Sequence, residues 1–304
     1  MRFRMPFQMS IKPYLALTRP FTLIAPMIAM ICGMLMSLLH RDEFHLFSEN
    51  VTTIFFAAIT MALAQMCGQV LNQAEDPVAL DILNNKAYRP IPQGHISQKF
   101  ARRIGLAIGT LALVAAFVIK LSLGIGIAII LFFAIFYSME PIRGKRRKII
   151  NTFWLGISRG LLPLLIAWSV FNSPWEAVPL ILGSVLFFWV SAFNITKDFS
   201  DMVGDRIFQV PTFPVVYGVK TTKLFMHWLN ALAFIIVIVA ILTGKLHPGF
   251  LITGIVFIIG VPIIQKLCLN SIKLKHIENN MGWMFFYLGL SLLYILFIIA
   301  MVIG

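Results

Sequence analysis

Two short acidic clusters hold six of the chain's twelve carboxylates, although charged residues make up only 12% of the sequence. The members are Glu75, Asp76 and Asp81 in the first cluster and Asp198, Asp201 and Asp205 in the second. Each cluster has an asparagine four residues before an aspartate, Asn72 before Asp76 and Asn194 before Asp198, which places both side chains on one helical face. Crowded carboxylates repel one another unless a cation lies between them, and Mg²⁺ takes hard oxygen ligands that substrate phosphates complete. Two such clusters facing each other would hold two Mg²⁺ ions.

Basic residues and a proline-rich turn follow both clusters. The turns span residues 89–93 and 211–215, and the basic residues nearby are Lys86, Arg89, Lys145, Arg146 and Arg206. Arginine neutralises phosphate oxygens through a bidentate fork and lysine acts as a point charge. This composition predicts a diphosphate site. Solvated loop charges are the ordinary explanation for charge between helices, but two clusters of like composition favour the site.

The rest of the chain is typical of a membrane protein. Its 304 residues are 59% hydrophobic and its mean hydropathy is +0.89, too apolar for a soluble chain. A bilayer core of about 30 Å needs roughly 20 apolar residues per helix. Nine segments qualify, at about 21–39, 51–72, 104–120, 122–137, 151–171, 175–197, 222–243, 248–265 and 281–303. We therefore expect an all-α fold, a multi-pass bundle of nine transmembrane helices that forms a single domain over residues 1–304.

The distribution of basic residues tests this count, because they collect on the cytoplasmic side of a membrane. Of 25 Lys and Arg residues, 21 fall in the N-terminal segment and the even-numbered connections, and three, Arg41, Lys120 and Lys245, fall on the opposite side. The remaining one, Arg159, lies near the start of the fifth span on the basic side. We expect a protein of the cell membrane whose N-terminus and acidic clusters face the cytoplasm. The net charge of +13 then reflects this bias and attraction to membrane lipids, and no nucleic-acid motif accompanies it.

Four spans separate the two acidic clusters. This spacing fits a bundle of two related four-helix halves plus a ninth helix, although the halves share little sequence beyond the clusters. The expected architecture brings the two clusters together at one end of the bundle.

At these residues the chain resembles the UbiA superfamily of intramembrane prenyltransferases, whose signatures are an NDxxDxxxD motif and a later DxxxD motif. Asp201 and Asp205 fit the second motif, and Asp198 is an additional aspartate often seen before it. Residues 17–20, 89–94, 137–146 and 158–160 are also similar to family segments. The segments 89–94 and 137–146 look more like the lipid and chlorophyll branches of the family than its hydroxybenzoate branch.

The first motif departs from the family pattern. Asn72 and Asp76 match, but Gln73 replaces an aspartate, and Asp81 lies nine residues after Asn72 where the family has eight. On an unbroken helix Asp76 and Asp81 would lie about 140° apart and could not share an ion. Pro77 is expected to end or kink the helix and let Asp81 turn inward. Glu75 is the alternative member of the first metal cluster.

The resemblance implies Mg²⁺-dependent transfer of a prenyl group from a prenyl diphosphate, such as geranylgeranyl diphosphate, to a lipid-like or aromatic acceptor within the membrane. It implies catalytic roles for Asp76, Asp201 and Asp205. The implied ligands of Mg²⁺ are Asp76, Asp81, Asp198, Asp201 and Asp205. The implied diphosphate-binding residues are Asn72, Arg89, Tyr137, Lys145, Arg146, Arg206 and Arg19.

Two other classes of protein compete with the enzyme. A transporter or flippase of an anionic amphiphile would place its ionisable groups and broken helices near the middle of the bilayer. Here those groups gather at helix ends on one side, which favours an enzyme. A membrane scaffold without chemistry would leave the paired acidic clusters unexplained.

Overall fold

The computed structural model describes residues 11–269 and 281–304, and over these the chain is helical with no strand. Nine helices of this part are long and apolar enough to cross a membrane. The predicted nine-span, all-α architecture is therefore confirmed. Four residues of the charge distribution, Arg2, Arg4, Lys273 and Lys275, lie outside the described residues.

Several spans are built from more than one helical segment. The first consists of α1 (Lys12–Thr18), η1 (Pro20–Leu23) and α2 (Ile24–His40), and the second of η2 (Phe44–Leu46) and α3 (Phe47–Glu75). The third and fourth are α5 (Gln98–Ile119) and α6 (Leu121–Ser138), and the fifth is α7 (Ile149–Gly156), η4 (Ile157–Leu161) and α8 (Leu162–Trp168). The sixth is α9 (Ala177–Phe193), η5 (Asn194–Lys197) and α10 (Asp198–Ile207), and the last three are α11 (Phe213–Leu242), η6 (Pro248–Thr253) with α12 (Gly254–Leu269), and α13 (Met281–Val302).

The spans form two large neighbouring apolar cores, and a third, smaller cluster joins Leu17 and α3 to the segment before α5. One core joins α2, α3, α5, α6 and α8, and the other joins α2, α8, α9, α11, α12 and α13. Helices α2 and α8 contribute to both, and α13 packs against α2. The two cores correspond to the expected halves. The ninth span, α13, belongs to the second core and packs against α2 of the first span.

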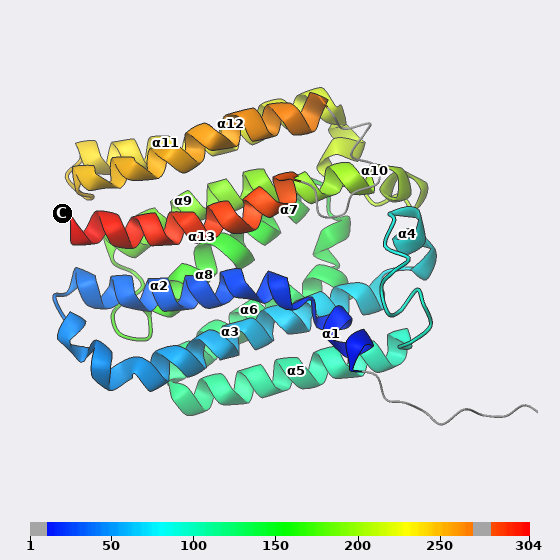
Figure 1. Ribbon diagram of the computed structural model, residues 1–304, viewed down its shortest axis with the longest axis horizontal. Coiled ribbons are helices and arrows are strands. Elements are labelled where there is room, and N and C mark those ends of the chain that lie inside the picture. The colour runs from blue at the N-terminus through cyan, green and yellow to red at the C-terminus, as the bar shows by residue number, and fades with distance from the viewer. Residues whose placement is uncertain (1–10, 270–280) are drawn as a thin grey trace, which may run out of the picture.

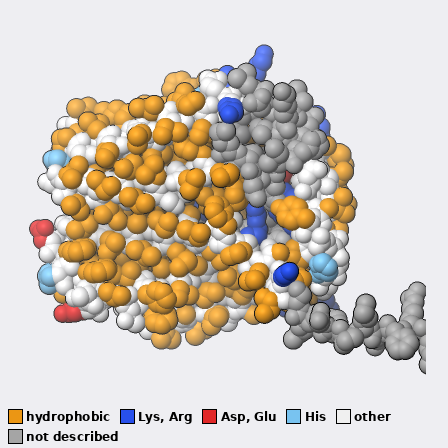
Figure 2. All heavy atoms as spheres, viewed as in Figure 1, with side chains coloured by type: hydrophobic (Ala, Val, Ile, Leu, Met, Phe, Trp, Pro, Cys, Tyr) orange, Lys and Arg blue, Asp and Glu red, His pale blue; other side chains and the backbone are white. Residues whose placement is uncertain are grey.

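The surface has the polarity that a bilayer requires. Hydrophobic side chains cover most of the face in Figure 2, and charged side chains gather toward its two ends. Apolar residues such as Val118, Leu242 and Ile258 are highly exposed. The short helix α4 (Val78–Leu83) and helix α10 lie together at one end of the bundle, opposite the C-terminus (Figure 1).

Pro77 separates two helices at this end, as the sequence predicted. Helix α3 stops at Glu75, and Asp76 is extended, with φ −77° and ψ 140°, because the proline ring disfavours helical dihedrals in the residue before it. The Gln98 side chain donates a 2.7 Å hydrogen bond to the freed Asp76 carbonyl. Helix α4 then starts at Val78 in a new direction. The break separates Asp76 and Asp81 from the α3 helical repeat.

Candidate active site

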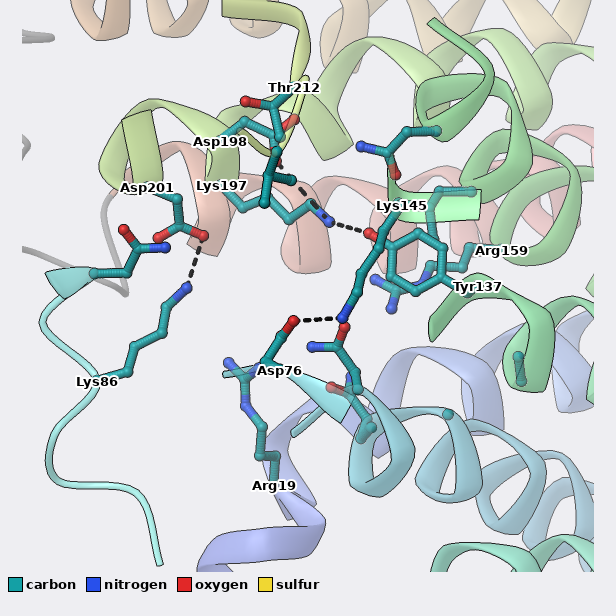
Figure 3. Close-up of a pocket in the computed structure, with 18 of the residues that line it drawn as sticks. Arg19, Asp76, Lys86, Tyr137, Lys145, Arg159, Lys197, Asp198, Asp201 and Thr212 are labelled. Carbon is teal, nitrogen blue, oxygen red and sulfur yellow. Dashed lines mark hydrogen bonds and ion pairs between the residues drawn. The ribbon is translucent and has the colours of Figure 1, made fainter. Parts of the chain in front are cut away.

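The two acidic clusters meet at one pocket at the α4 and α10 end of the bundle (Figure 3). Among the described residues, five carboxylates and seven cations line it: Asp76, Asp81, Asp198, Asp201, Asp205, Arg19, Lys86, Arg89, Lys145, Arg146, Arg159 and Lys197. Apolar side chains of α6, Ile130, Phe133 and Ala134, form another part of the wall. The pocket therefore combines a charged region with apolar walls between the spans.

The first cluster contributes side chains from both sides of the break at Pro77. Asn72 lies in the last turns of α3, and its Oδ1 accepts a 3.3 Å hydrogen bond from Ser138 Oγ. Asp81 on α4 is buried, and Arg89 donates to its Oδ1 at 3.1 Å. Both Asp76 and Asp81 line the pocket, whereas Glu75 lies outside its wall. Asp81 is thus the better-placed member of the two alternatives.

Glu75 is held elsewhere. Its Oε1 lies 2.5 Å from Arg102 Nε on α5, and half of the Arg102 side chain is exposed. The carboxylate that the sequence offered as an alternative is therefore paired with α5 and does not line the pocket.

The second cluster lies along one short helix. Asp201 and Asp205 are four residues apart on α10 and so share a helical face. Asp205 is buried and accepts hydrogen bonds from Asn84 Nδ2 at 3.4 Å and Thr212 Oγ1 at 3.2 Å. Asn84 follows α4, so this contact joins the first cluster's segment to the second cluster's helix.

Three cations bind carboxylates of the two clusters. Lys86 Nζ lies 2.6 Å from Asp201 Oδ2, and Lys145 pairs with Asp76 (Figure 3). Arg89 pairs with Asp81. Burial lowers the pKa of Lys145 and of Arg89, and the adjacent carboxylates oppose that shift. Each acidic cluster is thus neutralised in part by a cation, and a phosphate could replace the carboxylate as the partner of that cation.

The donor set suits a hard divalent cation. Aspartate carboxylates and asparagine amides supply oxygen ligands, and the Oδ1 atom of buried Asn84 has no hydrogen-bond partner among the described residues. In this arrangement no three His, Cys, Asp or Glu side chains of the described part are close enough to hold a metal ion together. Asp76, Asp81 and Asp201 instead contact cations, so binding a metal at these three carboxylates requires those contacts to open.

The family of the chain follows from comparison with known proteins. Residues 25–290 match the model of the UbiA prenyltransferase family. The chain belongs to this family. It is a UbiA-type prenyltransferase, an enzyme that transfers prenyl groups, and the enzyme class that the sequence predicted is confirmed.

Curated relatives of this UbiA-family enzyme include proteins of two different names. Protoheme IX farnesyltransferase of Listeria monocytogenes is 26% identical over 264 residues, which cover 85% of this chain and 82% of the relative. Digeranylgeranylglyceryl phosphate synthase of Methanobrevibacter smithii is 29% identical over 218 residues, which cover 70% and 71%. The two names state different activities, farnesyl transfer to protoheme IX and synthesis of digeranylgeranylglyceryl phosphate.

Solved structures share the fold of the UbiA-family enzyme. A digeranylgeranylglyceryl phosphate synthase matches with a TM-score of 0.69 and 22% identity over 97% of this chain and 99% of that chain. A UbiA homologue from Archaeoglobus fulgidus bound to GPP and Mg²⁺ matches with a TM-score of 0.66 and 17% identity over 96% and 100%. At these identities the likeness shows the common nine-span architecture.

Most of the predicted diphosphate-binding residues line the pocket of the UbiA-family enzyme. They are Arg19, Asn72, Arg89, Tyr137, Lys145 and Arg146. Arg206 does not: it follows Asp205, about 100° further round α10, and its side chain is exposed outside the pocket wall. The hydroxyl of Tyr137 accepts a 2.9 Å hydrogen bond from Lys197 Nζ.

Several pocket residues were not singled out from the sequence. Asn84, Asn151 and Thr212 line the pocket, and Lys197 reaches Tyr137 from η5. Asn84 lies three residues after Asp81, a helical spacing that could have indicated it. Lys197 precedes Asp198 and Thr212 lies in the 211–215 turn, so their positions beside the second cluster could also have indicated them. Asn151 lies far from both clusters in the sequence.

Proposed function

We propose that this enzyme transfers the prenyl group of a prenyl diphosphate, such as geranylgeranyl diphosphate, to a lipid-like or aromatic acceptor in the membrane, with Mg²⁺ bound at the two acidic clusters. The supporting observation is the single pocket that joins five carboxylates, seven cations and apolar walls. The diphosphate would lie at the charged end and the prenyl tail along Ile130, Phe133 and Ala134. Relatives that bind GPP with Mg²⁺ or carry the names of prenyltransferases support the same assignment.

The chemistry breaks one bond and forms another. The C1–O bond of the donor breaks and its electron pair leaves with the diphosphate, which produces an allylic cation. An acceptor atom then bonds to C1 and the acceptor releases a proton. Preorganised positive charge at the leaving oxygens lowers the barrier to the first step, and the apolar wall keeps water from the cation.

The pocket residues have two roles in this reaction, binding metal and binding phosphate. Asp76, Asp81, Asp198, Asp201 and Asp205 would hold the Mg²⁺ ions, with Asn72 and Asn84 as neighbouring oxygen ligands. Bound Mg²⁺ supplies Lewis-acid stabilisation of the diphosphate. Lys86, Lys145 and Arg89 would turn from the carboxylates to the phosphate oxygens, where Arg89 can bind two oxygens at once.

Orientation in the membrane is part of the proposal. The basic residues on the α4 and α10 side, with the bias of the whole chain, support a cell-membrane protein whose pocket faces the cytoplasm. A cysteine-accessibility experiment on intact cells tests it: an introduced cysteine at exposed Arg103 should react only after permeabilisation, and reaction with intact cells would contradict the orientation.

A product assay tests the activity. Purified protein is incubated with labelled farnesyl or geranylgeranyl diphosphate, with protohaem or geranylgeranylglyceryl phosphate as acceptor, and with or without Mg²⁺. We expect a prenylated product from at least one pair, only with Mg²⁺. No product from any pair, together with no metal-dependent binding of donor, would overturn the proposal.

A further inference from the structure

The fifth span presents an arginine to the pocket from an irregular helical segment. Residues Ile157–Leu161 form a π-helical turn between α7 and α8, and Arg159 in this turn lines the pocket. Such turns are rare and often occur at functional sites because they re-aim side chains within a helix. Here the turn sets the direction of Arg159.

Close packing fixes this turn against α9. A Cβ atom added to Gly160 would lie 2.6 Å from the Leu186 carbonyl oxygen, and one added to Gly156 would lie 2.1 Å from Ser191 Oγ. Only glycine allows the two backbones to approach this far. The backbone that carries Arg159 is therefore fixed by close packing against α9 and does not lie in a mobile loop.

Arg159 has no carboxylate partner. Among the described residues it makes no hydrogen bond or ion pair, in contrast to Lys86, Lys145 and Arg89, which all contact a carboxylate. Its charge interacts with that of Lys197, whose Nζ lies at 4.0 Å from the nearest oxygen of Asp198. Lys197 also donates a hydrogen bond to the Tyr137 hydroxyl, but Asp198 at 4.0 Å is the one carboxylate that either cation contacts among the described residues. The excess of positive charge makes this side of the pocket attractive to an anion.

A second polar group on the same wall also lacks a partner. Asn151 on α7 is 2% exposed and lines the pocket, and its Oδ1 accepts no hydrogen bond among the described residues. An unpaired buried acceptor is costly unless a ligand or water satisfies it. The fifth span thus presents to the pocket two polar groups that have no hydrogen-bond partner among the described residues, the Arg159 guanidinium and Asn151 Oδ1. Together they point to a bound molecule.

We propose that Arg159 and Lys197 form a second anion subsite, which holds a carboxylate or phosphate of the prenyl acceptor. The inference rests on the proposed function, because it assigns the acceptor's place in the same pocket. In Figure 3, Asp201 and Lys86 lie on one side, Arg159 and Tyr137 lie on the other, and Lys197 reaches toward the Tyr137 hydroxyl. The donor's diphosphate would occupy the carboxylate side and the acceptor's oxyanion the Arg159 side.

The charges of the pocket agree with two anionic ligands. Seven cations face five carboxylates before any metal or substrate is bound, and metal ions would add further positive charge beside the carboxylates. A diphosphate compensates the charge on that side. The pair of Arg159 and Lys197 then remains for an oxyanion that arrives with the acceptor.

The test compares acceptors that differ only in their acid group. Steady-state kinetics are measured with geranylgeranylglyceryl phosphate and geranylgeranylglycerol, and with protohaem and its dimethyl ester, for wild type, Arg159→Met and Arg159→Lys. Loss of a charge-assisted hydrogen bond predicts a rise of about 10- to 100-fold in KM for the acidic acceptor in Arg159→Met. KM for the neutral analogue and donor affinity should stay as in wild type, and Arg159→Lys should recover part of the loss. The acceptor pair that shows the effect identifies the oxyanion as phosphate or carboxylate.

Other outcomes separate the two proposals. No product from wild type with any acceptor contradicts the proposed function and this inference with it. Product from wild type with an unchanged acceptor KM in Arg159→Met contradicts the inference alone. Weaker donor binding in Arg159→Met would instead assign Arg159 to the diphosphate and overturn the subsite. Arg103→Met, which removes an exposed charge of α5 outside the pocket, is the matched control.

Discussion

Lys86 Nζ lies 2.6 Å from Asp201 Oδ2, and this ion pair connects the segment after α4 with α10 across the pocket (Figure 3). Both side chains are largely buried, with 11% and 16% of their surface exposed. Lys86 thus occupies a carboxylate that the proposed Mg²⁺ would use. When metal and diphosphate bind, this ion pair would open. Lys86 would then contact a phosphate oxygen and Asp201 would contact the metal.

Removing the Lys86 charge should therefore weaken donor binding. A charge-assisted hydrogen bond is worth about 1.5–3 kcal/mol, so Lys86→Met should raise the donor Kd about 10- to 100-fold. Arg206→Met is the informative comparison, since the sequence assigned Arg206 to the diphosphate but its side chain is exposed outside the pocket. Isothermal titration with a prenyl diphosphate and Mg²⁺ should show a change within about twofold for Arg206→Met. Equal losses in both variants would return Arg206 to the site.

The choice between Asp81 and Glu75 can be tested through stability. Asp81→Asn removes the charge of one member of the buried Asp81–Arg89 ion pair, and breaking a buried pair costs about 3–5 kcal/mol. Glu75→Gln breaks a pair whose Arg102 side chain is half exposed and should cost about 0–1 kcal/mol. Thermal unfolding in detergent measures the difference, and donor titration with Mg²⁺ should also weaken only in Asp81→Asn. A larger effect of Glu75→Gln on metal-dependent binding would reverse the assignment.

Pro77 is expected to be required for the geometry of the first cluster. Pro77→Ala lets α3 continue through Asp76, which turns Asp81 about 140° away from Asp76. We expect most of the prenyl-transfer activity to be lost while the protein stays folded by circular dichroism. Pro174→Ala, in the connection at the opposite end of the bundle, is the control and should retain activity. Full activity of Pro77→Ala would show that the break does not position Asp81.

Gly160 should tolerate no side chain. A Cβ there meets the Leu186 backbone at 2.6 Å, which cannot move without shifting α9, so Gly160→Ala should destabilise by about 1–3 kcal/mol. Gly68→Ala places its Cβ 3.2 Å from the Ala134 methyl group, a contact that small shifts relieve. Unfolding temperatures of the two variants in the same detergent provide the comparison. Similar values would contradict the close packing of the fifth and sixth spans.

The features that could be predicted from the sequence, the spans and the end of α3, depend on residues close together in the chain. Apolar length predicted all nine spans, and Pro77 predicted the end of α3, because both follow from bilayer thickness and proline geometry. Span ends were less accurate. The third span starts at Gln98 rather than 104, since Ser97 Oγ accepts a 3.2 Å hydrogen bond from the Phe100 amide and caps the helix.

Pairwise contacts between distant segments could not be predicted. The partner of Tyr137 is Lys197, sixty residues later in the chain, and Asn84 reaches Asp205 across 121 residues. Arg206 and Asp205 are neighbours in sequence, yet one is exposed and the other buried. Such differences depend on how α10 packs against α4 and α11, which residue type and spacing do not specify. For the same reason the π-helical turn that aims Arg159 has no signal in the sequence.

The central claim is that both acidic clusters together bind the prenyl diphosphate through Mg²⁺. Calorimetric titration of a prenyl diphosphate, at zero and millimolar Mg²⁺, tests it on wild type, Asp76→Asn, Asp201→Asn and the double variant. We predict binding to wild type only with Mg²⁺, loss of that binding in each single variant, and little further loss in the double variant, because the clusters act as one unit. Donor binding that is equally strong without Mg²⁺, and unchanged in Asp76→Asn and Asp201→Asn, would contradict the claim.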